Sequence, residues 1–359
     1  MAGRTGISVN SIHAANEALR VAELALRLDE TDRARQSFER LASGAGPAAV
    51  RARAEAGIGQ LAFLEDDART AIRHLERAYE LDPELDDPAA AETLGRAYAR
   101  IGLEEDAAVL FRRQLGRAEE RHDRVGRLRF TLLLANTLID ATEFSEAASL
   151  LSRAIADVPA GDSLALARVR LSQARLHAHR GETEVARRNA RQALELLEGS
   201  EHTVYTARAC QALAHIELDA GNAQEALVLV ERGRELLAGS GTDSDESAFA
   251  LEEARAFAQL GLLDEAVSLA MASARFVGAH PVDAGRSYAE LAAALDRSGD
   301  ISRALEVYEL AIEFHEKRPS VFLVEAYGRQ ADLLERVGKR AEAFAGYKRA
   351  AMLRAQLAR

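Results

Sequence analysis

Residues 95–111 read GRAYARIGLEEDAAVLF, and the pattern in this stretch decides the fold. The small residue Gly95 stands twelve residues before a second small residue, Ala107, with a turn glycine, Gly102, between them. Phe111 follows four residues after Ala107. Two small residues on opposite sides of a helix-breaking turn indicate two antiparallel helices that cross closely, because a large side chain at either position would hold the helices apart.

The same pattern recurs along the whole chain. Nine alanines, spaced by 36 to 40 residues, take the place of Ala107: Ala34, Ala71, Ala107, Ala147, Ala186, Ala226, Ala266, Ala304 and Ala343. Twelve residues before each stands another small residue: Ala22, Gly59, Gly95, Ala135, Ala174, Ala214, Ala254, Ala292 and Ala331. A fixed period of this size predicts stacked helical hairpins rather than one globular core. We therefore expect an all-α chain of nine helix pairs.

The turn inside each pair lies five residues before the key alanine. Six repeats place glycine there, which accepts the left-handed backbone conformation that ends a helix: Gly102, Gly181, Gly221, Gly261, Gly299 and Gly338. The other three repeats place Asp29, Asp66 and Thr142 in this position. Aspartate tolerates the conformation, but threonine is a poor substitute, so we expect a different turn geometry at Thr142.

The set of positions resembles the tetratricopeptide repeat (TPR): a small residue, alanine after twelve, a large apolar residue after four. The large position holds Phe38, Leu75, Phe111, Leu151, Val230, Tyr308 and Tyr347, while Ala190 and Ala270 depart from it. The resemblance covers about residues 13–357 and implies a right-handed superhelical solenoid of about nine antiparallel helix pairs, with a concave groove that binds peptides, protein tails or small effectors.

The repeats also look like the C-terminal sensor arrays of bacterial helix-turn-helix regulators. The period exceeds the family's usual 34 residues, and stretches such as LLLANTLIDATEFSEAASLL at 132–151 carry the likeness. Only about a dozen residues precede the first repeat, which is too short for a helix-turn-helix domain. We expect the DNA-binding part either to be absent or to act from another chain.

The expected organisation is an N-terminal arm at 1–12, repeats one to six at 13–238, a loop at 239–245, and repeats seven to nine with a capping helix at 246–359. Two connections are rich in glycine and serine, Ser43–Pro47 and Gly239–Asp245. Both fit ordinary surface turns. The second also fits a hinge between the two groups of repeats.

Composition narrows the function classes. The net charge is −11, and an acidic chain repels phosphate backbones, so we expect no direct nucleic-acid binding. No apolar run is long enough to span a bilayer, and no signal-peptide stretch is present, so we expect a cytoplasmic protein. The single cysteine, Cys210, fits a small buried residue in a reducing compartment. No nucleophile–base set, metal-ligand spacing or phosphate-binding loop is found, and we expect no enzyme, metal or cofactor.

The first helix of each repeat lines the concave wall, as the resemblance implies. Three rows on that wall carry twelve arginines: Arg27, Arg53, Arg96, Arg100, Arg129, Arg168, Arg175, Arg208, Arg255, Arg286, Arg297 and Arg336. The same rows carry five acids: Glu23, Asp140, Asp219, Glu325 and Asp332. Because guanidinium groups meet carboxylates in pairs, we expect an acidic or carboxylate-bearing peptide or protein tail as ligand. The candidate peptide-binding residues are Arg96, Arg129, Leu132, Asn136, Arg168, Leu171, Arg175, Arg208, His215 and Arg255.

The sequence leaves alternatives open for the arginines, for the role of the array and for its C-terminal end. The arginines could be solvated, or could pair with acids on adjacent helices such as Asp140 or Asp219. The array could be a passive protein–protein scaffold without a switching ligand, or a regulator fragment that acts through a separate DNA-binding part. The basic residues near the C-terminus cap the array, or contact an acidic partner or the second copy of a homodimer: Lys339, Arg340, Lys348, Arg349, Arg354 and Arg359.

Overall fold

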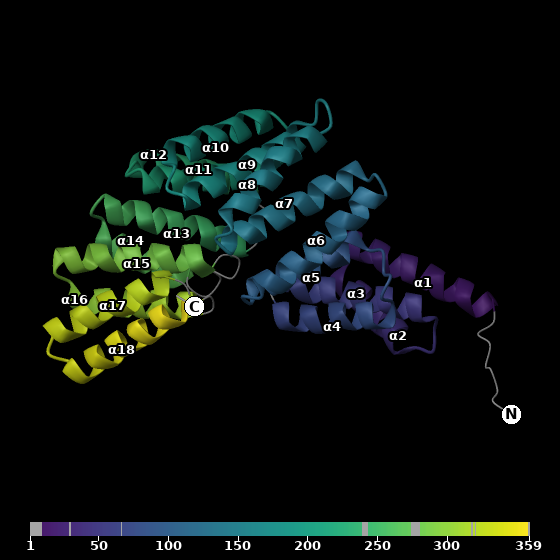
Figure 1. Ribbon diagram of the computed structural model, residues 1–359, viewed down its shortest axis with the longest axis horizontal. Helices are drawn as coiled ribbons and strands as arrows, with labels where there is room; N and C mark the ends of the chain where they lie inside the picture. Colours follow the sequence, from purple (N-terminus) through teal and green to yellow (C-terminus); the bar gives the residue numbers. More distant parts are fainter. Residues whose placement is uncertain are drawn as a thin grey trace. The chain divides into compact units, whose positions relative to one another are not determined.

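The chain is all-helical in the part that its computed structural model describes, namely residues 9–28, 30–65, 67–238, 243–273, 281–316, 319 and 321–357. Eighteen helices and no strand lie in these ranges (Figure 1). The first seven helices along the chain are α1 (Val9–Arg27), α2 (Thr31–Ser43), α3 (Ala48–Leu64), α4 (Ala68–Leu81), α5 (Pro88–Arg100), α6 (Glu104–Glu120) and α7 (Arg124–Asp140). None of the described helices is long and apolar enough to cross a bilayer.

The remaining helices complete the repeat series. They are α8 (Phe144–Asp157), α9 (Ser163–His179), α10 (Thr183–Leu197), α11 (Thr203–Asp219), α12 (Ala223–Leu237), α13 (Asp243–Gln259), α14 (Leu263–Ser273), α15 (Pro281–Ser298), α16 (Ile301–Glu316), α17 (Val321–Arg336) and α18 (Arg340–Leu357). The order alternates between the two helices of each expected pair, and the prediction of an all-α helical repeat solenoid is confirmed.

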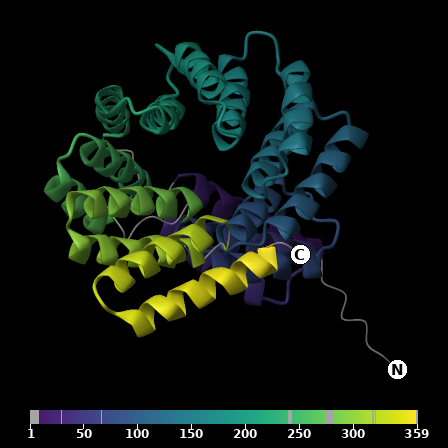
Figure 2. The same cartoon turned by 60° about the vertical axis from the view of Figure 1, so that its left-hand side comes forward.

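The chain divides into two compact units. Unit 1 spans Met1–Glu143 and contains α1–α7, and unit 2 spans Phe144–Arg359 and contains α8–α18. Figures 1 and 2 show unit 2 as successive pairs, from the teal α9 and α10 to the yellow α17 and α18. Within each unit the first helices of neighbouring repeats pack together, such as α3 with α5 and α13 with α15. The second helices of the described repeats make no comparable contact, so the first helices form the inner wall of each unit.

The small residues of the repeat lie where the sequence predicts. All nine key alanines are 0 to 2% exposed, and the small residues twelve positions earlier are buried as well. Close approach explains this. A Cβ atom added to Gly59 would lie 2.6 Å from Cγ of Leu75, and one added to Gly95 would lie 2.2 Å from the ring of Phe111. Such distances are far inside carbon–carbon contact, so the helices depend on the missing side chain.

The large position of the repeat is also confirmed as core. Phe38, Leu75, Phe111, Leu151, Val230 and Tyr308 are all at most 2% exposed. Tyr347 differs, with 36% of its surface exposed, and its hydroxyl donates hydrogen bonds to Asp332 and Glu335. The reason is its place on α18, the last helix described, which no further described repeat covers.

The turn at Thr142 corrects an expectation. Its φ angle is 63°, in the same left-handed region as Gly102 at 83°. The following hydrogen bonds match too: Glu143 N donates to Leu138 O at 2.8 Å, as Leu103 N donates to Tyr98 O at 2.9 Å. The prediction of a different geometry is therefore wrong. Threonine takes the strained conformation because these backbone hydrogen bonds and the burial of Leu138 hold the turn in place.

Several expectations fall on particular segments. The Ser43–Pro47 connection is the short link between α2 and α3, as an ordinary surface turn requires. Most of the 239–245 loop, the arm at 1–8, Asp29, Asp66 and Arg359 lie outside the described residues. The expected domain limits, including the hinge, therefore stay predictions. Cys210 is confirmed as buried, and burial raises the pKa of its thiol.

Candidate functional site

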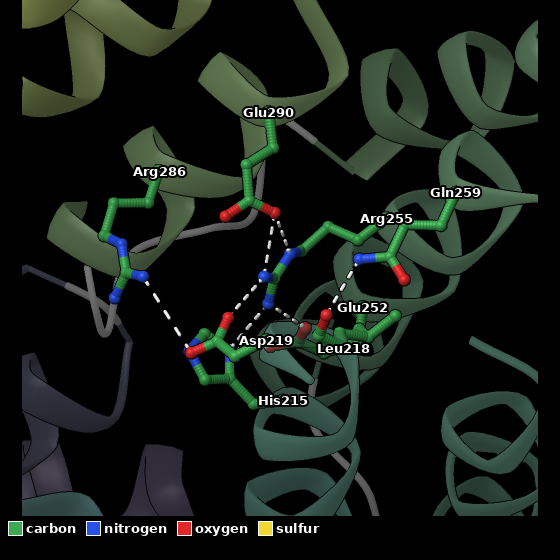
Figure 3. Close-up of polar contacts among 8 residues, drawn as sticks. All are labelled: His215, Leu218, Asp219, Glu252, Arg255, Gln259, Arg286 and Glu290. Carbon is green, nitrogen blue, oxygen red and sulfur yellow. Dashed lines mark hydrogen bonds and ion pairs between the residues drawn. The ribbon is translucent and has the colours of Figure 1, made fainter. Parts of the chain in front are cut away.

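A cluster of charged side chains lies on the inner wall of unit 2, where α11, α13 and α15 pack in succession (Figure 3). Arg255 of α13 is its centre, with only 2% of its side chain exposed. Its Nη2 atom donates to Oδ1 of Asp219 at 2.7 Å, and its Nη1 atom donates to Oε2 of Glu252 at 3.0 Å. Its Nε atom donates to Oε2 of Glu290 at 2.8 Å.

The three carboxylates around Arg255 come from three consecutive repeats. Asp219 ends α11, Glu252 lies one turn before Arg255 on α13, and Glu290 lies on α15. A buried guanidinium needs such partners, because an uncompensated charge in the interior is strongly destabilising. Burial lowers the pKa of Arg255, but the carboxylates more than offset this effect and the net pKa is raised. The cluster therefore links three repeats through one cation.

His215 adds a titratable group to the cluster. Its Nδ1 atom lies 2.8 Å from Oε1 of Glu252 and 3.0 Å from Nη1 of Arg255, and its Nε2 atom lies 3.8 Å from Oδ2 of Asp219. Burial lowers the pKa of His215, yet Glu252 and Asp219 outweigh burial and the repulsion from Arg255, so the net pKa is raised above 6.5. A proton on Nδ1 then serves the hydrogen bond to Glu252.

The same cations act on the carboxylates of Glu252, which is buried, and of Asp219, whose side chain is 20% exposed. Burial raises the pKa of Glu252 and of Asp219, but His215 and Arg255 outweigh it and hold both below their usual values. Arg286 of α15 adds a weaker attraction, with Nη2 at 3.9 Å from Oδ2 of Asp219. Gln259 of α13 donates from Nε2 to the carbonyl oxygen of Leu218 at 2.9 Å and so ties α13 to the end of α11.

A hollow of about 460 Å³ opens beside this cluster in unit 2. Its walls come from α13, α15, α16 and α17. Four arginines, two glutamates and two ring-bearing residues stand out in its lining: Arg255, Arg286, Arg297, Arg329, Glu290, Glu325, His315 and Phe322. Positive charge therefore exceeds negative charge in the lining. The hollow has the size and the mixed apolar and polar walls of a small ligand site.

Aromatic rings form one part of the wall. The rings of His315 and Phe322 stack with centroids 6.0 Å apart, and the guanidinium carbon of Arg286 lies 5.2 Å from the Phe322 centroid. A cation over a ring face is held electrostatically while its N–H edge stays available to an anion. His315 itself is fully buried, under Gly285 of α15.

The ten candidate residues from the sequence fall in both units. In unit 1, Arg96 and Arg129 approach the same carboxylate, that of Glu92, at 3.8 and 3.9 Å. Leu132 is 3% exposed and belongs to the core. Asn136 is half-buried, and its Oδ1 atom accepts no hydrogen bond from the described residues. A ligand contact at these four positions stays a prediction.

In unit 2, the structure brings His215 and Arg255 together in the cluster, but it places Arg208 earlier on α11 and the other three candidates on α9. Arg168 of α9 and Arg208 of α11 both lie with their guanidinium carbons 5.8 Å from the ring centroid of Tyr205. Leu171 packs partly buried against a small core cluster, and Arg175 lies on the same helix, α9. The peptide-binding role of these residues also stays a prediction.

Several residues of the hollow were not singled out from the sequence. Glu290 follows Arg286 by four residues, and Arg329 follows Glu325 by four, so each lies one helical turn from a predicted wall position. That spacing was the available signal. His315 carried no comparable signal, because α16 is a second helix and the three rows were counted along first helices only. Phe322 lies on the first helix α17, three residues before Glu325, but the three rows did not include its position.

Comparison with known proteins identifies relatives by structure alone. No protein-family model matches the chain, and no curated protein matches it significantly. The quorum sensor NprR from B. thuringiensis is similar at a TM-score of 0.66 and 12% identity, over 87% of this chain and 89% of NprR. The complex of NprR with its cognate peptide NprX gives 0.64 and 11%, over 87% and 90%.

Two further solved structures are similar to this chain in fold. A Rap protein complexed with Competence and Sporulation Factor has a TM-score of 0.61 at 15% identity, over 99% of this chain and 89% of that chain. A tetratricopeptide repeat protein from Parabacteroides merdae has a TM-score of 0.55 at 12% identity, over 74% and 93%. Identities this low concern the fold alone, and on that ground the chain is a helical repeat protein with the fold of the tetratricopeptide-repeat proteins.

Proposed function

We propose that this chain is a non-enzymatic peptide sensor whose unit 2 binds an acidic or carboxylate-bearing peptide in the hollow on its inner wall. The observation that carries the proposal is the lining of that hollow, where four arginines face two glutamates in about 460 Å³. Arg255 is already surrounded by carboxylates, so Arg286, Arg297 and Arg329 supply the remaining positive charge.

The chemistry of the lining suits a carboxylate. A guanidinium presents two parallel N–H groups that match the two oxygens of a carboxylate. Arg286 is held over Phe322, which fixes the orientation of its plane before a ligand arrives and reduces the ordering cost of binding. The ring of Phe322, which stacks on the buried His315, offers an apolar surface for the side chain or backbone next to that carboxylate.

The comparisons support a peptide rather than a free small acid. NprR shares the fold, and a structure of NprR holds its cognate peptide. The other candidate residues are proposed as peptide contacts within their own units: Arg96, Arg129 and Asn136 in unit 1, and Arg168, Arg175 and Arg208 in unit 2.

The experiment uses the full chain and a fluorescein-labelled pool of short peptides rich in Asp and Glu with free C-termini. A second pool carries amidated C-termini, and a third replaces Asp and Glu with Asn and Gln. Fluorescence anisotropy then shows whether acidic side chains or the terminal carboxylate supply the ligand charge. We expect binding of the first pool and weaker binding of the third.

Single charge reversals locate the site. Arg286→Glu, Arg297→Glu and Arg329→Glu should each lower the affinity at least about tenfold, since each removes a charged hydrogen-bond donor worth roughly 1.5–3 kcal/mol. Arg232→Glu is the matched control, because Arg232 lies on the second helix α12, outside the hollow, and pairs with Glu198. Loss of affinity in the control alone, or no binding of any pool, would refute the proposal.

A sensor also has to respond to its ligand. Small-angle X-ray scattering with and without the bound peptide should show a change in dimensions, because small rotations between repeats add along the array. Binding without any change in dimensions would instead identify a passive scaffold.

A further inference from the structure

The three carboxylates that surround Arg255 are not equally buried. The side chains of Glu252 and Asp219 are 8% and 20% exposed, whereas that of Glu290 is 44% exposed. Glu290 also lines the hollow, whereas Glu252 and Asp219 are not among its lining residues. Of these three anions, Glu290 is therefore the one that a ligand in the hollow can reach and replace.

The geometry of the contact makes the replacement favourable. Both Nε and Nη2 of Arg255 lie 2.8 Å from the same oxygen of Glu290, Oε2. An incoming carboxylate with two free oxygens gives each of these nitrogens its own acceptor, in the parallel arrangement that guanidinium groups prefer. Both contacts of Glu290 with this edge of Arg255 thus use one oxygen, where a ligand carboxylate can offer two.

Displacement has a mechanical consequence. Glu290 lies on α15 and Arg255 on α13, and these two helices pack as neighbouring inner-wall helices. Arg286, one turn earlier on α15, reaches the cluster only at 3.9 Å from Asp219. When a ligand takes the place of Glu290, the short ionic link between α13 and α15 is lost.

We propose that Glu290 is an internal competitor, which occupies the ligand edge of Arg255 in the empty protein and is displaced by the carboxylate of the bound peptide. The exchange breaks the ion pair between α15 and α13, so that ligand binding in the hollow changes the packing of repeats seven and eight. This inference rests on the proposed function, since it concerns the same hollow and the same class of ligand.

The test compares Glu290→Gln with Glu325→Gln in the full chain, using the acidic peptide pool with free C-termini. Both variants remove one negative charge from the lining, but only Glu290 contacts Arg255. Removal of the competitor should raise the affinity about fivefold, and Glu325→Gln should raise it by less than about twofold through general electrostatics. Glu290→Asp, which keeps the charge on a shorter side chain, serves as a second variant and should also raise the affinity.

A second readout follows the link between the helices. Amide hydrogen exchange along α15 should rise in the wild-type chain when the peptide pool is added. In Glu290→Gln it should be high already and change little on addition of the peptides. Glu325→Gln should behave like the wild type.

The outcomes separate the two proposals. If the wild type binds the pool and Glu290→Gln binds it no more tightly than Glu325→Gln, the competitor is refuted while the peptide site stands. If Glu290→Gln binds and the wild type does not, both proposals are supported, because the internal carboxylate then excludes the probe. If neither binds, the peptide site is refuted, and the competitor with it.

Discussion

Replacing Gly57 with alanine should destabilise unit 1, although the same substitution at Gly116 should stabilise it. Both glycines lie inside helices of unit 1, Gly57 in α3 and Gly116 in α6. A Cβ atom on Gly57 would lie 2.5 Å from the ring of Phe38, whereas one on Gly116 would meet nothing within 4 Å. The pair therefore isolates close helix packing from the ordinary helix preference of alanine.

The magnitude follows from these distances. Carbon atoms in contact lie about 3.5 Å apart, so the ring of Phe38 must move by about 1 Å. Phe38 is 1% exposed and packs in a core with Leu19, Val50 and Leu61, so it has little room to move. Overpacking of this kind costs about 2 kcal/mol, and alanine returns about 1 kcal/mol through helix propensity. We expect Gly57→Ala to lower the free energy of unfolding by about 1 kcal/mol and Gly116→Ala to raise it by about 1 kcal/mol.

Urea denaturation followed by circular dichroism provides the measurement. The midpoint of the unit 1 transition should fall for Gly57→Ala and rise for Gly116→Ala, with unchanged slopes. The difference between the two variants gives the overpacking cost directly, since the propensity contribution is common to both. If both substitutions stabilise the chain equally, the close approach of α3 to Phe38 is refuted.

Three further predictions concern other positions. Thr142→Gly should raise the free energy of unfolding by about 1 kcal/mol, because glycine adopts the left-handed φ of 63° without the steric cost that threonine carries; an unchanged thermal midpoint would contradict this. Arg255→Met should lower the free energy of unfolding by about 3–5 kcal/mol, since three carboxylates then lose their shared cation. This loss should be markedly smaller in a chain that already carries Glu252→Gln, and additive effects of the two substitutions would contradict the coupling. His215 has a folded pKa raised above 6.5, so its charged form adds stability that is fully present below about pH 6.5 and is lost as the pH rises through the folded pKa. The difference in unfolding free energy between the wild type and His215→Gln should therefore decline as the pH rises above about 6.5, and a constant difference would contradict the ionic role of the histidine.

The repeat pattern was sufficient to predict the fold because each key alanine reports a local requirement. Ala107, for example, is small because its own helix must cross the preceding one closely, and this need recurs with the period of the pair. The turn at Thr142 was predicted wrongly, because the preference of a single residue was weighed without the backbone hydrogen bonds that surround it.

The candidate site could be predicted only in part. Counting along first helices placed Arg255 on the inner wall, but it could not show that carboxylates from three repeats would enclose that side chain. Whether an arginine on a wall is solvated or enclosed depends on the rotation of neighbouring helices by a fraction of a turn. The alternative of arginines paired with acids on adjacent helices describes Arg255 well, since Asp219 is one of its partners.

The enclosed cation also sets a limit on how this array can be rearranged. Repeat proteins commonly tolerate loss, duplication or exchange of whole repeats, because each repeat contacts only its immediate neighbours. Here Asp219 lies 36 residues before Arg255, and Glu290 lies 35 residues after it. One guanidinium therefore depends on carboxylates from the repeat before and the repeat after its own. A recombination junction between α11 and α15 would remove at least one of the carboxylates that surround the buried guanidinium of Arg255. The sixth to eighth repeats therefore have to be kept together, both in evolution and in a designed array.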